Sequence, residues 1–165
     1  MFTLKSLSKK GVPAALEKAE KYRPLNEPKE AESICLDVLE IDPKNHKALV
    51  MLLLSITDQF GESISAEAER ARELLPRLRD KYKRHYYEGI IFERQAKAVL
   101  RQGSPGAKSH AYEWLRDAMD QFEKAEALRP SGNDDAILRW NTCARMIMEN
   151  NLTPREEEYL QPLLE

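Results

Sequence analysis

Glycine is scarce in this chain, and so is the alternation of β-branched residues that marks strands. Only 6 glycines occur among 165 residues, and valine, isoleucine and threonine never form a sustained alternating pattern. Alanine, leucine, glutamate, lysine and arginine dominate instead, and these residues favour helices. The hydrophobic fraction of 42% and the charged fraction of 33% therefore predict a single helix-rich domain, large enough to bury a core.

Cysteines and long apolar runs are also few. Cys35 and Cys143 are the only cysteines, and both lie on apolar faces of predicted helices, so we expect buried free thiols rather than a disulfide. The longest apolar run, residues 48–56, is too short to span a bilayer. No apolar run follows the charges near the N-terminus, which excludes a typical secretory leader. A cytoplasmic protein is the default expectation.

Motifs of known catalytic or cofactor chemistry are missing. His46, His85 and His110 lie far apart and show no metal-ligand spacing with either cysteine. The sequence has no glycine-rich phosphate loop, no GxSxG and no HExxH. Its many carboxylates read as solvated helix faces. We therefore expect a protein that is not an enzyme and that holds neither a metal nor a cofactor.

The charge balance argues against a protein that mainly coats nucleic acid. The formal net charge is -2, whereas nucleic-acid-binding domains are commonly basic. One stretch, residues 77–87, does mix basic and aromatic residues as RNA-binding surfaces do. A helix junction with a solvated face and buried tyrosines explains it better. A nucleic-acid-associated helical protein using residues 77–87 is the alternative function.

The clearest helix signal lies between Ser109 and Pro130. Four large apolar residues recur there at spacings of three and four, so they share one face of a helix. These are Tyr112, Leu115, Met119 and Phe122. Pro130 ends the pattern because proline lacks a backbone donor and clashes with the preceding turn. The same ending occurs at Pro43, after residues 36–42.

Similar signals predict eight helices in four pairs. The other expected helices are 13–23, 28–41, 46–59, one that follows Ser65, 80–102, 133–150 and a short one ending near residue 164. Expected caps are Asn26, Asn45, Ser65 and Asn133. Pro76 either stops the fourth helix or kinks it. Gly89, inside the fifth helix, predicts a close approach of another helix.

Paired helices with recurring stops are typical of a helical solenoid. Ala118, Phe122, Ala125 and Pro130 have the spacing of a second helix in the tetratricopeptide (TPR) repeat, and Tyr22, Ala31, Pro43, Gly89 and Phe92 match other units. Over roughly residues 12–150 the chain thus resembles the TPR family. Trp140 departs from it, because a small residue is expected there. Other solenoids of helix pairs stay open.

The resemblance implies an all-α, right-handed superhelix of about four antiparallel helix pairs. It would comprise a flexible basic arm (1–11), a repeat array (12–150) and a C-terminal capping helix (151–165). In such arrays the first helix of each pair lines a concave groove that binds a peptide or a partner helix. The expected function is therefore a non-catalytic protein–protein interaction scaffold.

On this register we predict a set of partner-binding residues from the first helices. They are Lys47, Met51, Leu54, Tyr86, Tyr87, Ile90, Arg94, Asn141 and Arg145. The family's carboxylate clamp uses lysine and asparagine where this chain has Leu16 and Glu20. A glutamate there would repel a carboxylate, so we do not expect chaperone-tail binding of that kind. The acidic C-terminal helix, with Tyr159, Leu160 and Leu163 on one face, would cap the array or join two copies as a homo-oligomer.

Overall fold

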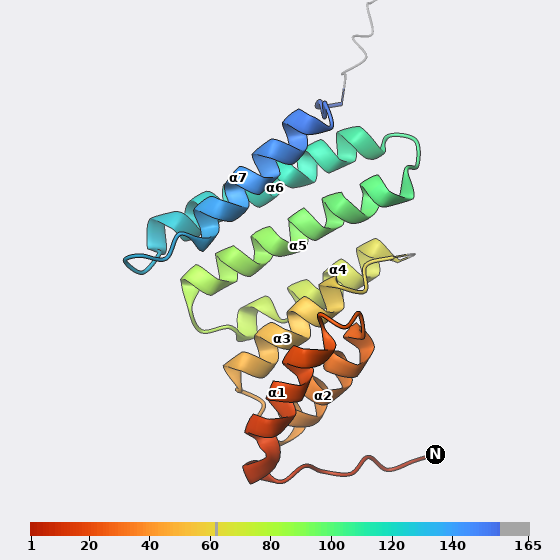
Figure 1. Ribbon diagram of the computed structural model, residues 1–165, viewed down its shortest axis with the longest axis vertical. Helices are drawn as coiled ribbons and strands as arrows, with labels where there is room; N and C mark the ends of the chain where they lie inside the picture. Colours follow the sequence, from red (N-terminus) through yellow and green to blue (C-terminus); the bar gives the residue numbers. More distant parts are fainter. Residues whose placement is uncertain (62, 156–165) are drawn as a thin grey trace, which may run out of the picture.

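The computed structural model describes residues 1–61 and 63–155. Within them the chain is all helical, with seven α-helices, two 3-10 turns and no strand (Figure 1). The helices are α1 (Val12–Tyr22), α2 (Pro28–Ile41), α3 (His46–Thr57), α4 (Ile64–Arg72), α5 (Lys81–Gln102), α6 (Ala107–Leu128) and α7 (Asp135–Glu149). The 3-10 turns are η1 (Lys9–Gly11) and η2 (Leu75–Arg77). The all-α prediction is confirmed.

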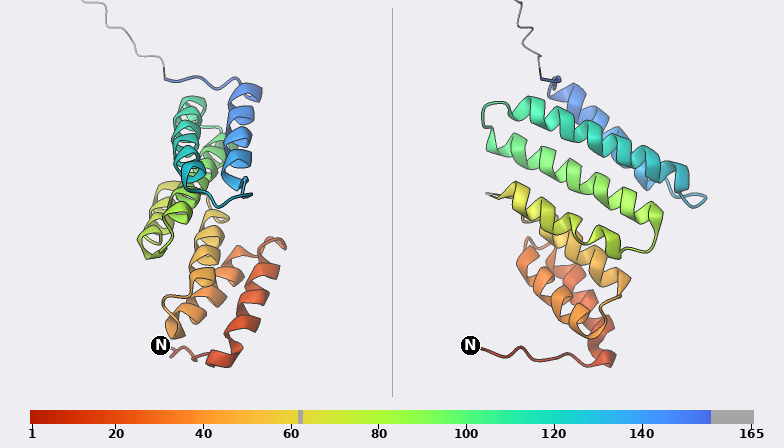
Figure 2. Two further views of the ribbon diagram at one scale, coloured as in Figure 1. Left: turned by 90° about the vertical axis from the view of Figure 1, so that its left-hand side faces the viewer. Right: turned by 180° about the vertical axis from the view of Figure 1, so that it is seen from behind.

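The helices stack one after another along the long axis of the molecule. Each helix from α1 to α6 packs on the next one in the chain, and α1 also contacts α3. The stack begins with α1 and α2 at one end and finishes with α6 and α7 at the other (Figures 1 and 2). Short connections make neighbouring helices run in opposite directions. Neighbours in sequence are therefore neighbours in space.

Two hydrophobic clusters form the core. The first is built mainly by α1 to α4 and the second by α5 to α7, and Leu54 and Tyr87 pack against both. Most of α3 is buried, as expected for a helix that is apolar nearly all round. Cys35 lies in the first cluster and Cys143 in the second, and both are buried free thiols as predicted.

Several predicted helix ends are confirmed and others are corrected. Asn45 caps α3, because its Oδ1 accepts a bond of 2.9 Å from the Ala48 amide. Asn26 does not cap α2: its φ of +61° places it inside the turn, and Glu27 precedes the helix. Ser65 is not a cap either, since α4 begins one residue earlier, at Ile64.

The fourth helix stops before Pro76 rather than kinking. It ends at Arg72, and Pro76 lies in η2 at a first-turn position, where its missing amide hydrogen is tolerated. The N-terminal arm ends in η1, where the Ser8 hydroxyl accepts a bond of 3.1 Å from the Gly11 amide. Leu7 packs against the first cluster. The arm is thus attached to the core near residue 7.

The interface between α5 and α6 explains Gly89. A Cβ atom at Gly89 would lie 2.5 Å from Cε1 of Phe122, so the predicted close approach is confirmed. In α6, Leu115, Met119 and Phe122 are buried as predicted, and Tyr112 is half-buried. This interface is the most extensive between any two helices of the described chain.

Two sequence predictions concern other properties of the chain. The C-terminal capping helix, with its homo-oligomer contact, falls largely on residues 156–165 and so lies outside the described residues. In the part of the chain that is described, no helix is both long and apolar enough to cross a membrane.

Candidate binding cleft

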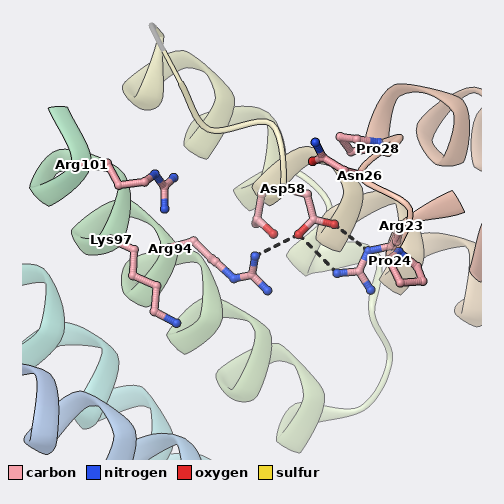
Figure 3. Close-up of a pocket in the computed structure, with 9 residues that line it drawn as sticks. Arg23, Pro24, Asn26, Pro28, Asp58, Arg94, Lys97 and Arg101 are labelled. Atoms are coloured by element: carbon pink, nitrogen blue, oxygen red, sulfur yellow. Dashed lines mark hydrogen bonds and ion pairs between the residues drawn. The ribbon is translucent and has the colours of Figure 1, made fainter.

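Three basic residues of α5 lie on one face of the helix. Arg94, Lys97 and Arg101 are spaced three and four apart, which places them one above another over two turns. The helix that carries them is fixed at both ends. Asp80 accepts a bond of 2.9 Å from the Tyr82 amide at the start, and Gly103, with a φ of +64°, ends it. Figure 3 shows Arg94 and Arg101 extending from α5 toward the ends of α1 and α3, with Lys97 between them on the same helix.

These side chains form one wall of a cleft of about 640 Å³. The opposite wall comes from the end of α1, the turn that follows it, the first residue of α2 and the end of α3 (Figure 3). The lining residues are Arg23, Pro24, Asn26, Pro28, Thr57, Asp58, Arg94, Lys97 and Arg101. Four of them are basic and one is acidic, so the lining is strongly positive.

Asp58 lies at the centre of the cleft and joins three helices. The Arg23 Nε donates to its Oδ2 at 2.7 Å, and the Arg23 Nη2 donates to its Oδ1 at 3.3 Å. The Arg94 Nη1 donates to the same Oδ1 at 2.9 Å. Asp58 ends α3, Arg23 ends α1 and Arg94 belongs to α5. One carboxylate thus serves two guanidinium groups, which are charge-assisted partners of well-matched geometry.

Glu93 is a second carboxylate that is shared by two basic side chains, one from α5 and one from α7. Its carboxylate is completely buried. It accepts bonds from Lys97 Nζ at 3.0 Å and from Arg139 Nη1 of α7 at 3.1 Å. The Cys143 thiol donates to its other oxygen at 3.7 Å. Burial, together with the charge of Glu93 and this hydrogen bond, raises the pKa of Cys143 to about 12. The thiol therefore stays protonated near neutral pH.

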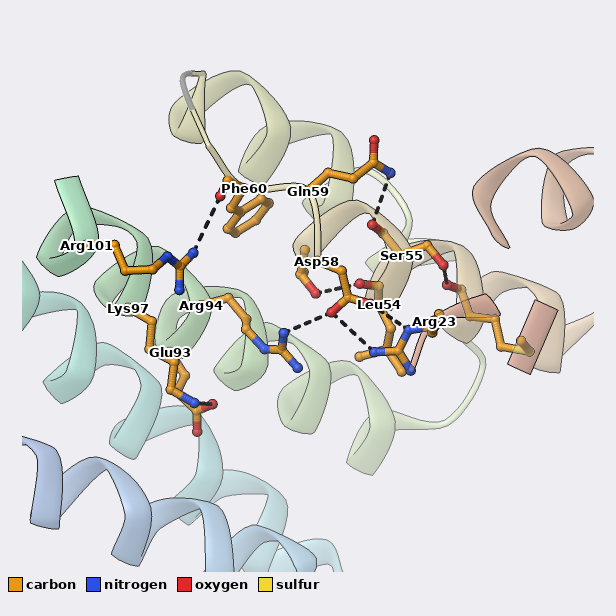
Figure 4. Close-up of polar contacts among 12 residues, drawn as sticks. Arg23, Leu54, Ser55, Asp58, Gln59, Phe60, Glu93, Arg94, Lys97 and Arg101 are labelled. Atoms are coloured by element: carbon orange, nitrogen blue, oxygen red, sulfur yellow. Dashed lines mark hydrogen bonds and ion pairs between the residues drawn. The ribbon is translucent and has the colours of Figure 1, made fainter. Parts of the chain in front are cut away.

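Arg101 is the third residue of the basic wall, and its charge is little neutralised by neighbouring groups. Its Nη2 lies 3.5 Å from the Phe60 carbonyl oxygen (Figure 4). Among the described residues no carboxylate approaches it within ion-pairing distance. The Nε of Arg94 is buried and has no hydrogen-bond partner in the same set. The cleft therefore offers cationic donors that its own acids do not saturate.

The structure places the nine predicted partner-binding residues in different surroundings. Of them, Arg94 lines the cleft. Met51 and Ile90 are buried in the core, which corrects their assignment to an open groove, and Leu54 is half-buried between the two clusters. Lys47 is exposed and pairs with Glu20 at 3.1 Å.

On the last described helix, α7, Asn141 is half-buried and Arg145 is exposed. Leu16 and Glu20, the residues at the clamp positions, both contact other parts of the fold. Leu16 is buried in the first cluster, and Glu20 is the partner of Lys47.

The tyrosines of the basic stretch 77–87 pack against one another. Tyr82 is buried and stacks on Tyr86 with ring centroids 5.8 Å apart, and Tyr87 meets Tyr86 edge-on at 5.2 Å. Burial raises the pKa of Tyr87 to about 12. Arg84 donates back to the Leu78 carbonyl oxygen at 2.8 Å. These contacts favour the junction interpretation, because the rings serve the packing rather than a base-stacking surface.

Sequence reasoning missed Arg23, Asp58, Lys97 and Arg101. The spacing of Arg94, Lys97 and Arg101 on one helix face is a signal that could have identified the basic wall. No comparable signal links Arg23 to Asp58, because 35 positions separate them. In the described residues, no group of three or more histidine, cysteine, aspartate or glutamate side chains could hold a metal ion.

Comparison with known proteins adds no relative. No family model matches the chain, and neither a curated protein nor a solved structure does so. The function must therefore be argued from the cleft and the helix arrangement.

Proposed function

We propose that this protein is a non-catalytic interaction scaffold that binds a partner peptide or helix. In this proposal the helices form a TPR-like array, with α1/α2, α3/α4 and α5/α6 as pairs and α7 as the first helix of a fourth. The partner would lie along the surface of the first helices, α1, α3, α5 and α7. Two buried reduced thiols fit the cytoplasm, which we propose as its location.

The observation that carries the proposal is the composition of the cleft. Its charged side chains come from α1, α3 and α5, one helix from each proposed pair. Arg139 of α7 shares the buried carboxylate of Glu93 with Lys97, so the basic side chains continue onto α7. In a helical solenoid, equivalent helices of successive repeats line one continuous binding surface. A cleft whose charged side chains come from every second helix is what such an array would present to a partner.

The chemistry of the cleft supports binding rather than catalysis. Guanidinium and ammonium groups are hydrogen-bond donors that recognise anionic or carbonyl oxygens. Asp58 accepts hydrogen bonds from two arginines at once, so its carboxylate oxygens are already occupied as acceptors. A binding surface uses such groups directly, whereas acid–base catalysis needs a group with a free proton site.

The proposal can be tested by selecting peptides from a displayed random library against the full chain. Bound peptides should shift the backbone amide resonances of α1, α3, α5 and α7 in NMR spectra, and leave those of α2, α4 and α6 largely unchanged. Replacement of Arg94 by glutamine should weaken binding of the selected peptides.

Arg116 provides a matched control for Arg94. It is an exposed arginine of α6, and no ion pair or hydrogen bond involves its side chain within the described residues. Arg116→Gln should bind the selected peptides as the unmodified chain does. Failure to select any peptide, or shifts confined to α2, α4 and α6, would show that the scaffold proposal is wrong.

A further inference from the structure

The cleft and the adjoining Glu93 cluster contain more cationic side chains than carboxylates. Asp58 is shared by Arg23 and Arg94, and Glu93 is shared by Lys97 and Arg139. With Arg101 added, the cations outnumber these two carboxylates by three. The basic side chains in these pairs are only 25–33% exposed. Water and salt therefore screen this excess charge less than they would on an open surface.

We propose that this cleft binds an acidic peptide segment, with aspartate or glutamate carboxylates held by Arg101, Lys97 and Arg94. The inference rests on the scaffold function and specifies the chemistry of the partner. Arg101 would make the first contact, because it is exposed and has no carboxylate partner among the described residues. Its planar group can hold a carboxylate through two parallel hydrogen bonds. Arg94, with an unused buried Nε, and Lys97 lie on the same face behind it.

The spread of the basic groups favours several carboxylates over one phosphate. Arg94, Lys97 and Arg101 are distributed over two turns of α5, and Arg94 already pairs with Asp58. A guanidinium group matches a single carboxylate in charge and in geometry. An acidic segment can place separate carboxylates along this row, whereas one phosphate group contacts only part of it.

The other walls of the cleft suit a polypeptide rather than a nucleic acid. Pro24 and Pro28 provide apolar contact beside the charges, and Asn26 is an exposed amide that can both donate to and accept from a peptide backbone. A nucleic acid would need stacking surfaces or an extended basic track. The tyrosine rings of residues 82–87 are already packed against one another.

A fluorescence anisotropy titration of the full chain tests the inference. The probe is a fluorescein-labelled peptide of glutamate, serine and glycine, and its counterpart has glutamine in place of every glutamate. We expect the glutamate peptide to bind at least about tenfold more tightly than the glutamine peptide, and more weakly as salt is added. Arg101→Glu should lower its affinity at least about tenfold, and Arg101→Gln by a smaller factor.

Arg116→Glu, which makes the same change of charge on α6, should leave binding unchanged. Circular dichroism should show full helicity for each variant, since both arginines are exposed. Equal binding of the two peptides, or equal binding by Arg101→Glu and the unmodified chain, would overturn the inference. So would displacement of the probe by inorganic phosphate or oligothymidine at a lower concentration than by unlabelled glutamate peptide.

The library selection separates this inference from the scaffold proposal. Selected peptides that shift α1, α3 and α5 but contain no excess of aspartate or glutamate would overturn the acidic partner and leave the scaffold standing. If the library yields no peptide and the glutamate probe does not bind, both are wrong. Acidic peptides whose binding depends on Arg101 would support both.

Discussion

A single methyl group added at Gly89 should test the close contact between α5 and α6. Gly89 lies in the middle of α5, against the ring of Phe122 in α6. In Gly89→Ala the new Cβ would lie 2.5, 2.8 and 2.9 Å from three carbon atoms of that ring. Carbon atoms in contact prefer separations of about 3.5–4.0 Å. The helices must therefore move apart, or the ring must leave its position.

Two opposing effects decide the result. Alanine is the better helix former, and this favours the variant by about 0.5–1 kcal/mol. Overpacking in a close-packed core costs about 1–3 kcal/mol. The upper part of that range applies here, since Phe122 is completely buried and the Tyr86 ring lies 5.9 Å from it. We expect a net loss of about 1–2 kcal/mol in the free energy of unfolding.

Urea unfolding followed by circular dichroism measures this loss. The midpoint of Gly89→Ala should fall by roughly 0.5–1 M, with an unchanged slope. The same substitution in a Phe122→Leu background is the matched control, because the smaller side chain removes the ring atoms that the methyl group meets. There the change should be neutral or stabilising by up to about 1 kcal/mol. The difference between the two backgrounds measures the coupling directly.

The sign of the effect makes the reasoning refutable. A higher midpoint for Gly89→Ala in the unmodified background would mean that helix propensity outweighs the contact. The approach of α5 to α6 would then be looser than the structure shows. Equal destabilisation in both backgrounds would mean that Phe122 is not the opposing group.

Two further predictions concern charge. Asp58→Asn should lower the free energy of unfolding by about 1–3 kcal/mol in urea titrations, between the values for exposed and buried pairs, because it leaves Arg23 and Arg94 without their shared carboxylate; an unchanged midpoint would contradict this. Burial raises the pKa of Cys35 to about 11 and of Cys143 to about 12, from 9.0. Both folded-state values are raised, so these thiols stabilise the fold below pH 9, and urea midpoints should fall as the pH rises from 9 toward 12. The Cys35→Ala, Cys143→Ala double variant should show a shallower fall, and an equally steep one would contradict the assignment.

The helices could be predicted from the sequence because local signals determine them. The stripe of Leu115, Met119 and Phe122 defines a buried face by spacing alone, and Asn45 is a cap that acts within three residues. Ser65 and Asn26 show where such signals fail. Both have cap-forming side chains, but Ser65 lies inside α4, and Asn26 lies one residue before Glu27, the residue that precedes α2. Packing of the neighbouring turns decides where a helix begins, and it placed the boundaries elsewhere.

The candidate site was only partly predictable, because it depends on rotation of the helices about their own axes. Met51 and Ile90 lie on α3 and α5, which both contribute to the cleft, yet both side chains are buried in the core. Arg94 was predicted because the repeat register places it on the first helix of the third pair. The contact between Arg23 and Asp58 joins the ends of two helices, and neither residue belongs to an amphipathic pattern that could mark it.

The contact at Gly89 and the basic cleft are linked through α5. Successive residues of a helix turn by about 100°, so Arg94, five positions after Gly89, points roughly 140° away from it. Gly89 lets one side of α5 lie against Phe122, and this fixes the rotation of the helix. That rotation turns Arg94 toward Asp58 and places Lys97 and Arg101 on the wall of the cleft. A larger residue at position 89 would therefore alter both the packing of the core and the direction in which the basic wall points.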